Sequence, residues 1–147
     1  MEKKKFEIET LFIITSAKKT EPFVLTVKNA SGEMDFFRRT FEIEGVGFNP
    51  EKAQGILRDF LITNILAKGV FVDSQKIDFN KVGLRKIKCK YYILLKEPSV
   101  IIKNSSFLSV YKIMDSKNKL SDQLREFLLD YVNEKRNIFE ETENGSN

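Results

Sequence analysis

The strongest constraint on the fold is the alternation of apolar and charged residues at the start of the chain. From residue 6 to residue 14, large apolar side chains recur at every second position except 10, at Phe6, Ile8, Phe12 and Ile14. Glu7 and Glu9 lie between them. A period of two is typical of a strand that is covered on one face, so this segment predicts a strand.

Further strands are predicted after it. One runs over 23–28 and one over 34–44, and the turn at 29–32 joins them, because Asn and Gly tolerate the positive φ of tight turns. The alternation slips at Phe36 and Phe37, where we expect a β-bulge. In the second half of the chain, strands are predicted over 70–73, 86–96 and 100–114.

Two segments carry apolar residues at helical spacing instead. One helix is predicted near 50–68, with Asn49 as its cap and Pro50 at its first position. Its internal Gly55 costs about 1 kcal/mol relative to Ala, which we interpret as a close approach to a neighbouring element. A second helix is predicted near 121–141.

This order of elements predicts an α+β fold. Strands and helices do not alternate, so we expect an antiparallel or mixed sheet of about six to seven strands, with one internal and one C-terminal helix packed against it. A chain of 147 residues, 41% of them hydrophobic, predicts a single domain. We place that domain at 1–142 and expect a disordered tail at 143–147.

Composition excludes several classes of site. The chain has no histidine and one cysteine, Cys89, so it can form no Ser-His-Asp or Cys-His site, no zinc site of the usual kinds and no internal disulfide. We therefore predict no metal, no cofactor and no catalytic residue. The single cysteine favours a cytoplasmic location, and no apolar run reaches the length of a membrane-spanning helix.

Paired carboxylates are the remaining catalytic candidates, at Glu7 and Glu9 and at Glu42 and Glu44. Alternating carboxylates on a strand are usually solvated, so we favour a structural role for them. Gly45 and Gly47 lie where a phosphate-binding loop would, but the third glycine and the Lys-Ser/Thr ending are missing. We interpret them as a tight bend before the first helix, and Cys89 as a core residue.

A run of basic residues is the main candidate for a binding surface. On a strand over 86–96, Lys86, Lys88, Lys90 and Tyr92 project to one face, and Arg85 precedes them. Such a ladder suits an anionic partner, above all a nucleic acid whose bases stack on the tyrosine. The alternative, which we favour, is a soluble strand surface whose lysines face the glutamates of neighbouring strands.

The far end of the C-terminal helix is the second candidate. Tyr131, Ile138 and Phe139 continue its apolar side, but Lys135 interrupts the stripe. This end could therefore leave the body of the protein and contact a partner or form a homodimer. The alternative, which we favour, is that the helix lies along the sheet throughout.

From these patterns we predict a small non-catalytic interaction protein that docks on another macromolecule through a sheet face or its C-terminal helix. A protein is the expected partner, and no membrane is involved. The first alternative is a sequence-tolerant nucleic-acid-binding protein that uses Lys86, Lys88 and Lys90. The second alternative is an enzyme that works with carboxylates or lysines alone.

Overall fold

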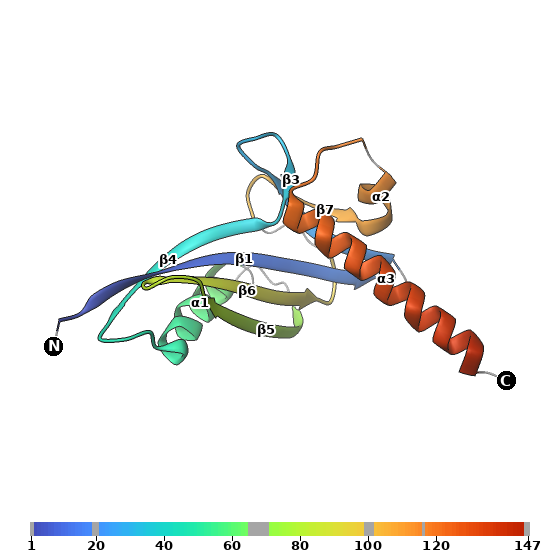
Figure 1. The fold of residues 1–147 in the computed structure, drawn as a ribbon. Helices are drawn as coiled ribbons and strands as arrows, with labels where there is room; N and C mark the ends of the chain where they lie inside the picture. Colours follow the sequence, from blue (N-terminus) through green and yellow to red (C-terminus); the bar gives the residue numbers. More distant parts are fainter. Residues whose placement is uncertain (1, 19–20, 65–70, 99–101, 116, 146–147) are drawn as a thin grey trace.

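The computed structural model describes residues 2–18, 21–64, 71–98, 102–115 and 117–145. Within these ranges it has seven strands in one mixed sheet and three helices (Figure 1), which confirms the predicted fold class. In chain order the elements are β1 (Lys4–Lys18), β2 (Glu21–Lys28), β3 (Met34–Asp35), β4 (Phe37–Gly45), α1 (Pro50–Asn64), β5 (Val72–Lys81), β6 (Lys86–Leu95), β7 (Ser105–Ser109), α2 (Val110–Asp115) and α3 (Asp122–Gly145).

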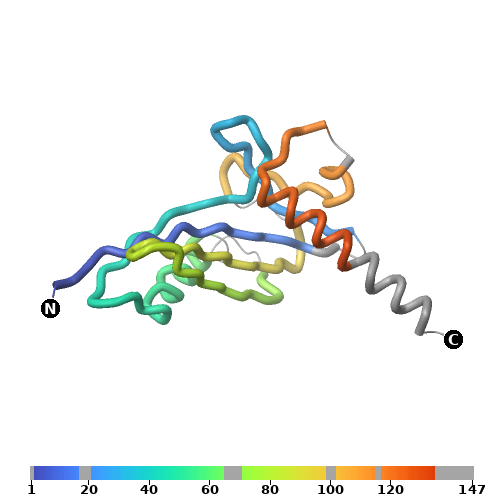
Figure 2. The backbone as a smooth tube through the Cα atoms, in the orientation of Figure 1, coloured from blue at the N-terminus to red at the C-terminus, as the bar shows by residue number. Residues whose placement is uncertain are grey.

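The long strand β1 organises the sheet. It pairs in parallel with β6 from Glu7 to Ser16, so two segments far apart in the chain run side by side (Figure 2). Along its other edge, β1 pairs antiparallel with β4 over its first half and with β2 over its end. β5 continues the sheet beyond β6, while β3 and β7 both pair with β2. The parallel pairing of β1 with β6 makes the sheet mixed.

The two faces of β1 belong to two different cores. Phe6, Ile8, Phe12 and Ile14 pack in one cluster with Leu57 and Leu61 of α1. On the opposite face, Leu11 and Ile13 pack in a second cluster with residues of α2 and α3. α1 and α3 accordingly lie on opposite sides of the sheet (Figure 1). Since the second cluster reaches only the latter half of β1, Glu7 and Glu9 stay exposed.

The first helix forms where its cap predicts. Oδ1 of Asn49 accepts hydrogen bonds from the backbone N of Glu51 at 3.1 Å and of Lys52 at 3.3 Å, and α1 begins at Pro50. Its predicted apolar stripe is buried at Ala53, Leu57 and Leu61. The interpretation of Gly55 is wrong: this residue is exposed, and a Cβ added there would have no atom of another element within 4 Å.

The predicted bulge is a break between two strands. β3 ends at Asp35 and pairs with β2, whereas β4 begins at Phe37 and pairs with β1. Phe36, between them, is 1% exposed, and its ring centroid lies 5.4 Å from that of Phe127 in α3. Phe37 instead stacks on Phe60 of α1 at 6.0 Å. The slip in the alternation therefore marks where the chain changes its strand partner.

Several predicted boundaries differ from those observed. The strand expected over 100–114 is the short β7 followed by α2, because Val110 and Ile113, three residues apart, pack together into the second cluster. The strand expected at 70–73 is the start of the longer β5. Residues 65–70 and 99–101, which include the predicted end of the first helix, lie outside the described residues.

The C-terminal helix is longer than predicted. α3 ends at Gly145, so 143–145 of the expected disordered tail are helical, and 146–147 lie outside the described residues. A single domain over 1–142 stays a prediction. Across the described ranges, no helix is both long and apolar enough to span a membrane.

Candidate functional site

The sheet face opposite α1 is open beside the first half of β1. Two rows of side chains cross it, Thr40, Glu9 and Lys88 in the first and Arg38, Leu11 and Lys90 in the second. Gln123, in the first turn of α3, adds a wall. These residues line a cavity of about 180 Å³, which we call the open-face cavity.

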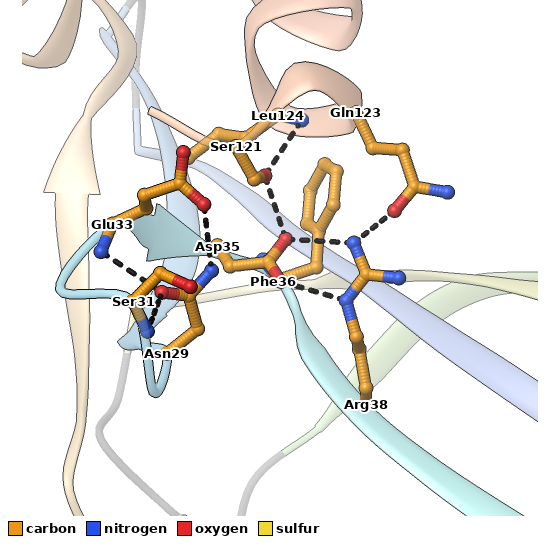
Figure 3. A network of polar contacts seen from close by, with 9 residues as sticks. All are labelled: Asn29, Ser31, Glu33, Asp35, Phe36, Arg38, Ser121, Gln123 and Leu124. Carbon is orange, nitrogen blue, oxygen red and sulfur yellow. Dashed lines mark hydrogen bonds and ion pairs between the residues drawn. The ribbon is translucent and has the colours of Figure 1, made fainter. Parts of the chain in front are cut away.

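Asp35 holds the guanidinium of Arg38 in a fixed orientation. Arg38 Nε donates to Oδ2 of Asp35 at 2.7 Å, and Nη2 donates to Oδ1 at 3.0 Å (Figure 3). Nη2 also donates to Oε1 of Gln123. The third nitrogen, Nη1, takes no part in this network and points away from Asp35 (Figure 3). A two-bond pairing of this kind fixes the plane of the guanidinium as well as its position.

The same carboxylate also anchors α3. Asp35 is 4% exposed, and its Oδ1 accepts hydrogen bonds from Ser121 Oγ at 2.7 Å and from the Phe36 backbone N at 2.8 Å. Ser121 Oγ in turn accepts from the backbone N of Leu124 at 3.2 Å, so it caps the helix. Asp35 therefore joins the end of β3, Arg38 and the start of α3 in one network.

The charge of Asp35 is stabilised despite its burial. Burial alone raises the pKa of this carboxyl, but the hydrogen bonds from Arg38, Ser121 and the Phe36 amide, together with the charge of Arg38, outweigh it. The net result is a pKa below the ordinary 3.8. Asp35 is therefore ionised at neutral pH and keeps Arg38 in place.

The charges around the cavity favour an anion. The charge of Arg38 is offset by Asp35, while Lys88 and Lys90 face only Glu9 among the lining residues. Thr10, Arg39 and Cys89 complete the lining. The guanidinium carbon of Arg39 lies 5.2 Å from the ring centroid of Phe60 on the α1 side, so its charge is directed to the other face. Among the lining residues that face the open side, one positive charge is thus left in excess, and Asp78 of β5 lies opposite Lys90 in the register.

The predicted lysine ladder forms, but only part of it reaches the cavity. Lys86, Lys88 and Lys90 are exposed and alternate with buried neighbours along β6, as predicted. Lys86 does not line the cavity. Arg85 is exposed just before β6, and its carbonyl accepts a hydrogen bond from the Glu7 backbone N at 2.9 Å. Tyr92 is half-buried against the second cluster, farther along the strand.

Two of the three lysines lie opposite glutamates of β1, as the favoured interpretation expects, whereas Lys90 lies opposite Leu11. In the parallel register Glu7 lies opposite Lys86 and Glu9 opposite Lys88. The positive stripe is therefore flanked by a negative one. This arrangement weakens the premise for a nucleic-acid surface, which needs a continuous track of positive charge.

The C-terminal candidates are only partly described. Tyr131 is half-buried, and its ring centroid lies 6.3 Å from that of Phe127. Lys135, Ile138 and Phe139 lie within α3, but their side chains are outside the described part of the chain. A protein partner or homodimer contact at this end stays a prediction.

The remaining candidates, which are Cys89, the two glycines and the strand carboxylates, lie in surroundings that fit a structural role. Burial raises the pKa of the Cys89 thiol to about 12, so it is protonated at neutral pH. At Gly45 an added Cβ would lie 2.8 Å from the Gly47 carbonyl oxygen, which agrees with a tight bend. Glu42 and Glu44 are exposed on β4. Among the residues that the structure describes, no group of three or more carboxylates and cysteines could hold a metal ion.

The sequence did not indicate Arg38, Thr40 or Gln123 as site residues. Arg38 and Thr40 reach the site through their pairing with β1, and Gln123 reaches it through the position of α3. A local signal existed only for Arg38, because Asp35 lies three residues before it. That signal was too weak to distinguish a positioned arginine from a surface ion pair.

Comparison with known proteins shows distant likeness only. No family model and no curated protein matches the chain. One similar solved structure is the NUDIX domain of Shewanella oneidensis NrtR complexed with ADP ribose, at 11% identity over 86% of each chain and a TM-score of 0.46. Another is the C. elegans Ap4A hydrolase, at 11% identity over 75% of this chain and 85% of that one, with a TM-score of 0.43. A third is the complex between the C-terminal domain of mouse MUTYH and human PCNA, at 12% identity, 88% and 90% coverage and a TM-score of 0.42.

Against these comparisons, the predictions of a non-catalytic interaction protein and of no enzymatic activity are wrong, because the neighbours include a hydrolase and a NUDIX domain. The physical reason is that the absence of histidine excludes fewer mechanisms than the sequence prediction assumed. It excludes mechanisms that need an imidazole, but carboxylates, lysines and hydroxyl groups can still transfer protons. The similarity assigns no substrate and no reacting residue to this chain.

Proposed function

We propose that this chain binds a small organic phosphate in the open-face cavity. The supporting observation is the orientation of Arg38, whose Nε and Nη2 are held by Asp35 before any ligand arrives. Its Nη1 is left for the ligand, and Lys88 and Lys90 supply two further donors. A fixed guanidinium beside flexible ammonium groups suits the several oxygens of a phosphate.

Glu9 sets a second requirement on the ligand. It is the acidic residue among those that line the cavity, next to Lys88 in the register. A carboxylate there accepts a hydrogen bond from a hydroxyl or amine of the ligand and repels a second phosphate group. Any proton transfer on the bound ligand would use this carboxylate.

A charge-reversal pair tests the proposal. Lys88→Glu and Lys86→Glu change the same charge on the same strand, and each lysine faces a glutamate of β1, but only Lys88 lines the cavity. Titration with inorganic phosphate and with glycerol phosphate, followed by NMR, should show at least tenfold weaker binding for Lys88→Glu, because a hydrogen bond to a charged group contributes about 1.5–3 kcal/mol. Lys86→Glu should change the affinity by less than threefold.

Two outcomes would contradict this function. Equal losses in the two variants would mean that phosphate responds to the overall charge of the surface. Saturable binding of neither phosphate to the wild-type chain would remove the proposal altogether. Arg38→Lys adds a separate check, since it keeps the charge but loses the planar fork and should bind both phosphates more weakly.

A further inference from the structure

The open-face cavity is one end of a longer groove. A second cavity of about 140 Å³ shares Leu11, Lys90 and Gln123 with it. A third cavity of about 400 Å³ shares Ile13 and Phe127 with the second. The three hollows therefore follow one another along the same face of the sheet.

Strand and helix geometry explain why the groove is continuous. Its floor consists of alternate residues of β1 and β6, which the parallel register keeps level from Leu11 beside Lys90 to Thr15 beside Leu94. The five residues of each strand span about 13 Å from the first Cα to the last. Its wall is the stretch of α3 from Gln123 to Tyr131, which spans about 12 Å. The strands that form the floor and the helix that forms the wall therefore cover about the same length of the groove.

The chemistry of the groove changes along its length. The open-face cavity presents Lys88, Lys90 and Arg38, whereas the third cavity is lined chiefly by half-buried apolar and aromatic side chains. Those side chains are Tyr92 and Leu94 of β6 and Phe127 and Tyr131 of α3. The exposed residues Ser74, Gln75 and Lys76 of β5 complete this lining on the solvent side. Between the two ends, α3 adds Glu126 and Asp130 to the lining.

We infer that the ligand is an amphipathic organic phosphate, with its head in the open-face cavity and an apolar tail along Tyr92 and Phe127. This inference rests on the proposed function, because the cationic end must hold the head. The two carboxylates in the middle repel a second anionic group, so a polyanion laid along the groove is disfavoured. An uncharged alkyl chain of the ligand is not repelled by these carboxylates and can cover the apolar end of the groove.

Alkyl phosphates with four, eight and twelve carbons test the inference, used below their micellar concentrations with inorganic phosphate as reference. Full burial of a CH₂ group is worth about 0.8 kcal/mol, and half-burial in an open groove corresponds to about a twofold gain per carbon. We therefore expect the affinity to rise at least tenfold from the four-carbon to the eight-carbon phosphate. Octanol should bind much more weakly than octyl phosphate.

Two variants separate the tail from the head. Leu94→Lys places a charge at the half-buried far end of the groove and should abolish the gain with chain length, while inorganic phosphate binds as in the wild type. That unchanged phosphate binding also shows that the variant is folded. Lys88→Glu should weaken the binding of every phosphate in the series.

The failures are distinguishable. If inorganic phosphate binds but chain length has no effect, the amphipathic ligand is wrong and the phosphate site stands. If no phosphate binds, the site itself is wrong. A gain with chain length that persists in Leu94→Lys would place the tail elsewhere and overturn the inference.

Discussion

Replacing Asp35 by Asn should destabilise the protein by about 2–3 kcal/mol at pH 7, because one buried carboxylate joins three parts of the fold. Arg38 donates to both carboxylate oxygens, and Ser121 and the Phe36 amide donate to Oδ1. Asn keeps the shape and one oxygen. It removes the charge and places an NH₂ group against Arg38 Nε, so a donor faces a donor.

The magnitude follows from the contacts. The Arg38 side chain is 45% exposed, so its ion pair contributes no more than about 1 kcal/mol. The bonds from Ser121 and the Phe36 amide are buried, and each loses about 1 kcal/mol when the acceptor becomes neutral. For a chain of this size the sum lowers Tm by about 5–10 °C.

Urea denaturation followed by far-UV circular dichroism measures this loss, with an unchanged slope showing that only stability has moved. Glu33→Gln is the matched control, because Glu33 lies in the same hairpin and, among the residues that the structure describes, its carboxylate accepts a hydrogen bond from Asn29 Nδ2 alone, at 3.2 Å. It should change the free energy of unfolding by less than about 0.5 kcal/mol.

The dependence of stability on pH is an independent test of the network. The pKa of Asp35 is lower in the folded than in the unfolded chain, so its contribution is complete above pH 3.8 and is lost as the pH falls through the folded value. The difference in the free energy of unfolding between the wild type and Asp35→Asn should therefore become smaller as the pH falls below 3.8. Equal stability of the two proteins at pH 7 would refute this account of the network.

Further outcomes are expected at four residues. Gly55→Ala should stabilise the protein by about 1 kcal/mol in the same denaturation assay, since Gly55 is exposed within α1, whereas Gly45→Ala should destabilise it because its Cβ would lie 2.8 Å from the Gly47 carbonyl oxygen. Phe36→Ala should cost about 3–5 kcal/mol, because the ring is fully enclosed in the second cluster; a cost below about 1 kcal/mol would contradict that packing. Cys89, with its thiol pKa raised to about 12, should resist alkylation by iodoacetamide at pH 8 in the folded chain and react once urea unfolds it; fast reaction without urea would show that the thiol is accessible.

The elements that sequence patterns predicted well depend on neighbours in the chain. The cap of Asn49 acts on amides two and three residues ahead, and the turn at 29–32 is closed by Asn29 Oδ1 accepting from the backbone N of Ser31 and Glu33. The alternation of Lys86, Lys88 and Lys90 with buried residues follows from the pleat of one strand. Such features need no knowledge of the rest of the fold.

The candidate site depends on pairing that no local pattern specifies. Arg38 and Lys90 line the same cavity only because β4 and β6 pair with opposite edges of β1 in one particular register. Gln123 is hydrogen-bonded to Arg38 although the two residues are 85 positions apart in the chain. The parallel pairing of β1 with β6 places the buried residues of both strands together on the α1 side, while α2 and α3 cover only the latter half of β1 on the other face. Local residues thus selected helix, strand and charge pattern, because those interactions reach only a few residues along the backbone. The cavity and its groove arose from long-range packing, because only burial in two cores selects one strand register among several that the pattern alone allows.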